Sequence, residues 1–163
     1  DFVDQVIEAL DQLKLEPKYL ELEITESILM ESYDTIAGKL KLLKLRGIKI
    51  ALDDFGKGYS SLNYLKQLPI STLKIDKTFI DTISSEGIDK SLMDLIVRIG
   101  KTMDLCVVAE GVETQEQLDY LVEHQCSKIQ GYYFSKPVTE DQVADIAKRQ
   151  VESLCRNICN IEQ

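Results

Sequence analysis

The stretch IKIALDDFGKGYSSLNYLKQLPISTLKID, residues 48–76, contains two short apolar runs separated by an amphipathic run. Residues 48–55 and 72–76 are rich in branched aliphatic side chains and have the length of strands, whereas residues 60–68 have helical spacing. A strand, a helix and a second strand in succession indicate a parallel strand pair joined by a right-handed crossover. This stretch therefore predicts an α/β fold.

The same alternation recurs along the chain. Strands are predicted at residues 19–25, 48–55, 72–76, 105–112 and 128–134. Helices are predicted at residues 2–14, 31–47, 60–68, 88–103, 114–125 and 139–150, with Gly47 at a helix end and capping signals at Thr114 and Thr139. Five βα units imply a parallel sheet, either a doubly wound plane or an arc of a barrel. We expect one domain over residues 1–150 and a helical extension over residues 151–163.

Composition restricts the class of partner. The 163 residues are 44% hydrophobic and carry a formal net charge of −9, which is typical of a globular protein and unsuited to duplex nucleic acid or a broad anionic membrane contact. A nucleotide would need a local site or a cation. Without a long apolar run or a secretory signal, the expected compartment is the cytoplasm, although the parent protein could be tethered to a membrane upstream.

The cysteines and the histidine do not indicate a site. Cys106 lies in an apolar run, and Cys155 and Cys159 have the spacing of one helix face without further ligands nearby. His124 is the one histidine and stands near the end of a predicted helix. A serine–histidine–acid triad or a multi-histidine zinc site therefore has almost nothing to be built from, and the sequence favours a histidine at a helix end.

Polar residues interrupt the predicted strands at their C-terminal ends, where parallel α/β folds bind ligands. They are Glu23 and Glu26, Asp53 and Asp54, Lys74 and Asp76, Glu110 and Glu113, and Gln130. Taken singly, Asp54, Asp76 or Glu26 could cap a helix, and Lys74 could pair with Asp76. Helix capping does not, however, require acids at four consecutive strand ends.

Carboxylates gathered at one edge repel one another unless protons or cations neutralise them. Without soft or imidazole ligands, the expected cations are Mg²⁺ or Mn²⁺. Asp53 and Asp54 could serve two such ions, which at about 3.5–4 Å apart can activate water in a phosphoryl displacement. A lysine on the next strand, Lys74, could orient that water or neutralise phosphate charge.

Four segments together resemble the signatures of the EAL domain family of bacterial cyclic di-GMP phosphodiesterases. They are LELEITES (20–27), IALDDFGKGYSSLNYLKQLPISTLKIDKTFI (50–80), VVAEGVET (107–114) and IQGYYFSKPV (129–138). The resemblance covers about residues 1–150. It implies a TIM-like barrel that hydrolyses cyclic di-GMP to the linear dinucleotide pGpG with Mg²⁺ or Mn²⁺.

The resemblance also implies roles for individual residues. Glu23 and Asp53 would bind one metal ion, Asp53 would bridge to a second that Asp54 also binds, and Glu110 would reach the second ion or its waters. Lys74 would hold the attacking water, and Gln130 would position water or substrate.

Further roles follow from the same resemblance. Glu26 would anchor the loop after Asp54, a loop linked to activity and to homodimer contacts. Asp76 and Glu113 would support the site, and Phe134 and Pro137 would border a guanine. Lys57 stands where the family commonly has threonine, which is a mild change.

The chain resembles the C-terminal two-thirds of the domain. The Glu-Ala-Leu motif and a metal-binding asparagine are expected ahead of Asp1, and the letters IEAL at residues 7–10 are read as coincidence. We therefore expect the 163 residues alone to form a partial barrel of about five βα units that is inactive and poorly stable. An upstream sensor or diguanylate cyclase domain would fit the parent protein.

Three functions remain open at this point. The first is an active metal-dependent cyclic di-GMP phosphodiesterase. The second is a degenerate EAL domain that senses cyclic di-GMP or acts as a scaffold. The third is an unrelated Mg²⁺-dependent phosphotransfer enzyme on a doubly wound sheet.

Overall fold

The computed structural model describes residues 1–56, 62–84 and 88–148. The chain divides into two compact units, Asp1–Tyr133 and Phe134–Gln163. The first unit contains the sheet and the residues at its edge, so it is the unit that matters for the candidate site.

Five parallel strands form the sheet of the first unit. They are β1 (Glu21–Thr25), β2 (Lys49–Phe55), β3 (Thr72–Ile75), β4 (Cys106–Glu110) and β5 (Lys128–Gln130), and they pair in the order β1-β2-β3-β4-β5. A doubly wound sheet reverses its strand order at a switch point, whereas a barrel adds each strand beside the one before. Because the described order has no reversal, the sheet is an arc of a (β/α) barrel, and the doubly wound alternative is wrong.

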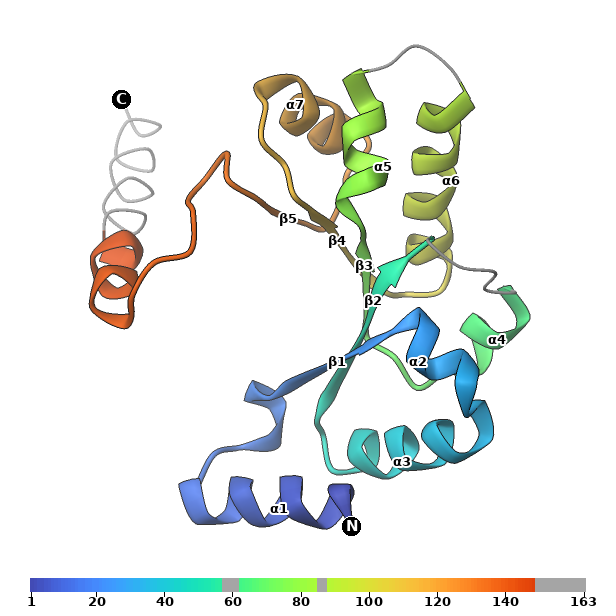
Figure 1. Ribbon diagram of the computed structural model, residues 1–163, viewed down its shortest axis with the longest axis vertical. Coiled ribbons are helices and arrows are strands. Elements are labelled where there is room, and N and C mark those ends of the chain that lie inside the picture. The colour runs from blue at the N-terminus through green and yellow to red at the C-terminus, as the bar shows by residue number, and fades with distance from the viewer. Residues whose placement is uncertain (57–61, 85–87, 149–163) are drawn as a thin grey trace, which may run out of the picture. The chain divides into compact units, whose positions relative to one another are not determined.

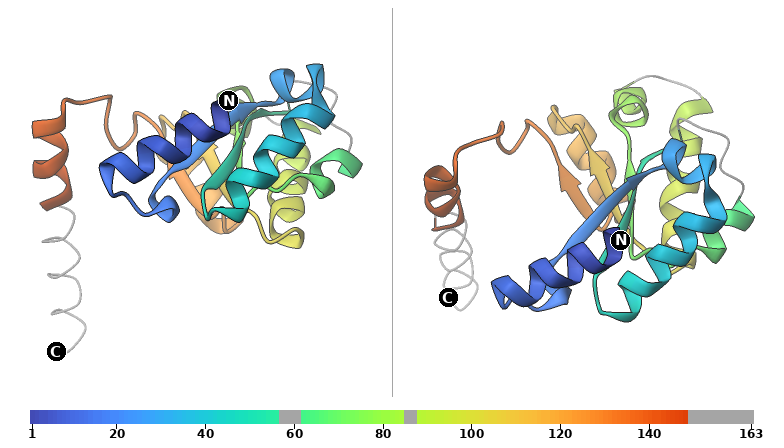
Figure 2. Two further views of the ribbon diagram at one scale, coloured as in Figure 1. Left: turned by 90° about the horizontal axis from the view of Figure 1, so that it is seen from below. Right: turned by 60° about the horizontal axis from the view of Figure 1, so that its bottom comes forward.

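In the first unit, two helical segments precede β1 and the others connect consecutive strands. They are α1 (Phe2–Leu13), η1 (Pro17–Tyr19), α2 (Glu26–Glu31), α3 (Tyr33–Leu45), α4 (Leu62–Gln67), α5 (Lys77–Asp81), η2 (Thr82–Ser84), α6 (Ile88–Thr102) and α7 (Gln115–Glu123). Figures 1 and 2 show α3, α4 and α6 on the same side of the strands. Helix α3 packs on β2, and helix α6 packs on β4.

The two faces of the sheet differ in polarity because side chains alternate along each strand. The face toward the helices is apolar, with Ile50, Leu52, Leu73 and Ile75 all fully buried. The opposite face is lined by polar residues from neighbouring strands: Glu21 and Glu23, Lys49 and Asp53, Thr72 and Lys74, Glu110, and Lys128 and Gln130. The hydrophobic core therefore holds the sheet from one side and leaves a polar face for a site.

The observed elements differ from the predicted ones at three places. The helix predicted at residues 31–47 is α3, which begins at Tyr33, and a separate helix, α2, precedes it because Ser32 leaves helical geometry at φ −148° between the two. The fifth strand ends at Gln130 rather than residue 134, because the chain turns there and the Tyr133 N–H donates to the Val112 carbonyl. The short helix α5 was not predicted.

The capping signal at Thr114 is confirmed. Its hydroxyl accepts from the Gln117 N–H at 3.2 Å, and the Gln117 side chain accepts from the Thr114 N–H at 3.1 Å. This reciprocal arrangement satisfies backbone donors that a helix start otherwise leaves unpaired. It fixes the start of α7 beside the end of β4.

The second unit is described as far as residue 148. Residues 140–148 are helical, and the Gln142 side chain accepts from the Thr139 N–H at 3.2 Å. The predicted extension at residues 151–163, with Cys155 and Cys159, lies outside the described residues. Over the described part of the chain, the helices are too short or too polar to cross a bilayer.

Gly131 provides a direct test of the close packing between the residues that follow β4 and β5. A Cβ at this position would lie 2.1 Å from the Val112 carbonyl oxygen and 2.3 Å from the Val112 nitrogen. We expect Gly131→Ala to lower the free energy of unfolding by about 1–3 kcal/mol, measured by chemical denaturation. Gly38→Ala is the matched control, because a Cβ there meets nothing within 4 Å and the helix interior favours alanine. Equal stability of the two variants would contradict this packing.

Candidate functional site

A β-bulge separates Asp53 and Asp54 from the regular alternation of β2. Leu52 pairs with Leu73 and Phe55 pairs with Ile75, so two residues of β2 face the single Lys74 of β3. Asp54 takes the extra position at φ 56°, and its N–H donates to Asp53 Oδ1 at 2.9 Å. Aspartate is one of the few residues that adopts this left-handed conformation readily. Because of the bulge, the side chain of Phe55 is buried in the core, as that of Leu52 is, and the two aspartates lie between these buried residues.

Lys74 connects the carboxylates of three other strands. Its ammonium lies 2.7 Å from Glu23 Oε1, 2.9 Å from Glu110 Oε1 and 3.4 Å from Asp53 Oδ1. The Lys74 side chain is 10% exposed, whereas those of Asp53 and Glu110 are 22% and 21% exposed and that of Glu23 is 52% exposed. A single cation therefore pairs with acids from β1, β2 and β4 at one edge of the sheet and offsets part of their negative charge.

The charge of Lys74 is stabilised by these contacts. Burial by itself would lower the pKa of the Lys74 ammonium, but hydrogen bonds to Glu23 and Glu110 and the charges of Glu110 and Asp53 outweigh it. The net result is a pKa of Lys74 above its ordinary value. Lys74 is therefore charged at neutral pH and acts as a donor and counter-ion rather than as a base.

Glu26 ties β1 to the segment after the aspartates. This first residue of α2 is only 2% exposed, and its Oε2 accepts from the Gly56 N–H at 3.1 Å. Gly56 has φ 101°, and a Cβ there would lie 2.5 Å from the Phe79 ring. The chain leaves β2 in a conformation that only glycine fits, and the loop predicted to follow, residues 57–61, lies outside the described residues.

A pocket of about 340 Å³ opens beside this cluster at the ends of β3, β4 and β5. Glu110 belongs to both the pocket and the Lys74 cluster, and Gln130 is its register partner on β5. The other lining residues are Asp76, Lys77, Gly111, Glu113, Gly131 and Tyr132. The carboxylate cluster and a space for a small molecule are therefore adjacent.

Lys77 is a site residue that the sequence analysis missed. Its ammonium pairs with Glu113 Oε1 at the pocket, across 36 positions of the chain. The hydrogen bond to Glu113 raises the pKa of Lys77 above its ordinary value. A polar residue directly after Asp76 at the end of a strand was the available signal.

Asp76 caps α5, as the capping alternative predicted. Its Oδ1 accepts from the Thr78 N–H at 2.9 Å and from the Thr78 hydroxyl at 2.6 Å. Asp76 also lines the pocket, so capping does not exclude a supporting role. Phe134 and Pro137 belong to the second unit, and the guanine contact predicted for them stays a prediction.

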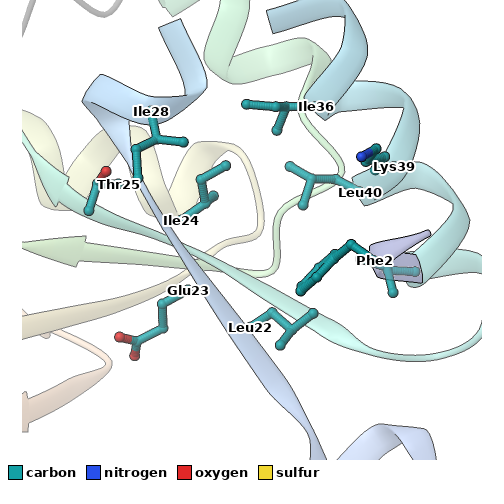
Figure 3. A pocket seen from close by; sticks show the side chains of 10 residues that line it. Phe2, Leu22, Glu23, Ile24, Thr25, Ile28, Ile36, Lys39 and Leu40 are labelled. Atoms are coloured by element: carbon teal, nitrogen blue, oxygen red, sulfur yellow. The ribbon is translucent and has the colours of Figure 1, made fainter. Parts of the chain in front are cut away.

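A second cavity lies on the opposite face of β1. It has a volume of about 350 Å³ and is lined mainly by apolar side chains of β1, α2 and α3. Figure 3 shows the Glu23 carboxylate directed away from Leu22 and Ile24 on the same strand. Because side chains alternate along β1, the Glu23 carboxylate lies on the polar face of the sheet, whereas the cavity lies on the face that the helices cover.

His124 lies outside the site. It follows the last residue of α7, stacks on Tyr120 with ring centroids 4.0 Å apart, and places Nε2 3.3 Å from Asp94 Oδ1. The helix-end interpretation is confirmed.

The donor set fits hard divalent cations in chemistry. Glu23, Asp53, Asp54 and Glu110 offer only carboxylate oxygens, which Mg²⁺ and Mn²⁺ prefer. Within the described residues, however, no three acidic, cysteine or histidine side chains form a ready metal-binding group. The Lys74 ammonium lies between three of the carboxylates. Binding of a metal ion there would require the ammonium to shift.

Comparisons with known proteins agree with this geometry. A family model described as "EAL domain" matches residues 1–137. The bifunctional diguanylate cyclase/cyclic di-GMP phosphodiesterase MucR of Pseudomonas aeruginosa is 43% identical over 141 residues, 86% of this chain and 21% of MucR. The cyclic di-GMP phosphodiesterase NbdA of the same species is 44% identical over 136 residues, 83% of this chain and 17% of NbdA. The chain thus spans about a fifth of these relatives.

Solved structures show the same fold. The PaMucR phosphodiesterase in complex with c-di-GMP superimposes with a TM-score of 0.83 at 43% identity, over 86% of this chain and 57% of that one. Klebsiella pneumoniae BlrP1 in its manganese and cyclic di-GMP complex has a TM-score of 0.77 at 32% identity, over 83% of this chain and 34% of that one.

Removal of the Lys74 charge tests the electrostatic account. In the full-length natural protein with a chelator present, we expect Lys74→Met to lower the free energy of unfolding by about 1–3 kcal/mol, because the carboxylates lose their counter-ion. Mn²⁺ should then raise the melting temperature of the variant more than that of the unsubstituted protein.

Lys128→Met is the matched control, because it removes the same charge from an exposed position of the same sheet. A Lys74→Met protein that melts like this control, with and without Mn²⁺, would contradict the account.

Proposed function

We propose, since the chain belongs to the EAL domain family, that it hydrolyses cyclic di-GMP to linear pGpG in bacterial second-messenger signalling. The observation that carries the proposal is the cluster of Glu23, Asp53 and Glu110 around Lys74, beside a pocket at the strand ends. This is the edge at which parallel α/β folds bind ligands. MucR and NbdA carry names that state the same activity.

The reaction breaks one phosphodiester bond. A water oxygen forms a bond to phosphorus, the bond from phosphorus to the 3′-oxygen breaks, and that oxygen takes up a proton. Lys74, whose ammonium contacts Glu23 and Glu110, would donate hydrogen bonds to the water or to a phosphate oxygen. Gln130, at the pocket beside Glu110, would position water or substrate.

Two divalent ions, Mg²⁺ or Mn²⁺, would supply water activation and neutralise charge on the phosphate when bound. Glu23 and Asp53 would hold one ion, and Asp53, Asp54 and Glu110 would hold the other. The bulge supports this assignment, because it releases Asp54 from the alternation that would direct it toward the helices. Glu26 would keep the loop start in place through the Gly56 N–H.

Sensing without turnover is the second candidate. The observation that favours it is that the Lys74 ammonium pairs with carboxylates from three strands, an arrangement that can hold the site together without turnover. A domain in that state could bind cyclic di-GMP and pass the signal to a partner. Turnover decides between the two candidates.

Further proposals concern partners and the extent of the chain. A homodimer would form through the loop after Asp54, and a sensor or diguanylate cyclase domain would accompany this chain in the natural protein. The 163 residues assayed alone would be inactive, because β1 and β5 are unpaired edges in the described sheet. A monomer at all concentrations in sedimentation analysis, or normal turnover by the 163 residues, would contradict these points.

The enzymatic proposal predicts a specific loss of activity. In the full-length natural protein with Mn²⁺ or Mg²⁺, we expect release of pGpG from cyclic di-GMP, measured by chromatography. Asp53→Asn should lower kcat by about 100-fold or more, because charge stabilisation at the reacting phosphate is lost. Asp34→Asn, in the first turn of α3, is the control that should retain activity. Cyclic di-GMP binding without any pGpG release would favour the sensor.

A further inference from the structure

The Lys77–Glu113 pair presents a donor and an acceptor side by side at the pocket. The ammonium of Lys77 contacts Glu113 Oε1, and both side chains remain 43% and 46% exposed. The pair is not part of the Lys74 cluster, whose acids are Glu23, Asp53 and Glu110. An exposed ion pair contributes little to stability, so its position at the pocket suggests another use.

The backbone on both sides holds this pair in place. Gly111 has φ 77°, and a Cβ there would lie 2.6–2.8 Å from the Cβ, Cγ and Cδ atoms of Lys77, so the lysine stem packs directly on bare backbone. The Glu113 N–H donates to Gln117 Oε1 at 2.8 Å, which ties the residue to the start of α7. Both charged groups thus extend from fixed backbone, as preorganised recognition requires.

The rest of the pocket suits a planar ring. Gly111 and Gly131 line the pocket with backbone alone, and Tyr132, which is 57% exposed, lines it with an aromatic ring. Any nucleobase can stack on such a ring, because stacking does not distinguish one base from another. The polar pair would then decide which base is accepted.

Guanine has the complementary pattern of donors and acceptors. Its O6 accepts, while its adjacent N1–H and N2–H₂ donate; adenine instead has an amino donor at the position of O6. We propose that Lys77 donates to O6 and Glu113 accepts from N1–H and N2–H₂ of one guanine of the substrate, so that this pair selects guanine over adenine. This inference rests on the proposed function and adds the residues that set base specificity.

Analogues of the base separate the two contacts. Cyclic di-IMP keeps O6 and N1–H but lacks the N2 amino group, and cyclic di-AMP reverses the pattern at position 6. In the full-length natural protein, we expect affinity for cyclic di-GMP to exceed that for cyclic di-IMP by roughly tenfold or more, because the lost donor pairs with a charged acceptor. Titration calorimetry in Ca²⁺ would measure binding, and turnover in Mn²⁺ would measure KM and kcat.

Each variant has its own expected signature. Glu113→Gln should weaken cyclic di-GMP more than cyclic di-IMP, so that the ratio between them falls toward one. Lys77→Met should weaken both equally, because both have O6, and should reduce the discrimination against cyclic di-AMP. Glu116→Gln, an equal charge change on the exposed first turn of α7, should leave all three ligands unchanged.

The outcomes distinguish this inference from the proposed function. If the unsubstituted protein neither binds nor hydrolyses a cyclic dinucleotide, the proposed function fails and this inference fails with it. If cyclic di-GMP is hydrolysed but both variants keep the original ratios among the three ligands, the base-reading role is overturned and the proposed function stands. A uniform loss of affinity for all three ligands in both variants would show a structural pair, which also overturns it.

Discussion

The fold and the site meet at the Lys74 ammonium. Three strands bring carboxylates to this edge of the sheet, and without a cation between them these charges would repel across a partly dry space. Lys74 lies on β3, between two of these strands, and is buried; the acids raise its pKa against the opposing effect of burial. The positive charge of Lys74 and the negative charges of the three carboxylates therefore stabilise one another.

The sheet achieves this with one departure from regular geometry. Strict alternation assigns every second residue to the apolar helical side, which is why Ile50, Leu52 and Ile75 are fully buried. Two adjacent aspartates cannot both follow that rule. The bulge at Asp54 accommodates the second one, and the Glu26 contact to Gly56 fixes the chain directly after it. The left-handed backbone at the end of β2 is thus held in place by the carboxylate at the start of α2.

The sequence was sufficient for the pattern but not for the contacts. Hydrophobic period located all five strands, and acids at successive strand ends located the edge where the site lies. The bulge could not be predicted, because an Asp-Asp step reads equally well as regular strand or as a turn. The pair of Lys77 and Glu113 was also missed, because the two residues are 36 positions apart and only the fold brings them together. The end of β5 was misplaced, since aromatic residues 132–134 favour a strand while the backbone contact to Val112 imposes a turn.

The central claim is that this edge exchanges the contacts of Lys74 for divalent cations that serve phosphodiester hydrolysis. Anomalous scattering from manganese, in crystals of the full-length natural protein grown with cyclic di-GMP, tests it most directly. The account predicts two manganese peaks with Asp53 between them, and a Lys74 ammonium moved from the carboxylates toward water or phosphate. Manganese bound elsewhere, or bound ligand with Lys74 still held by all three acids and no metal at Asp53, would contradict it.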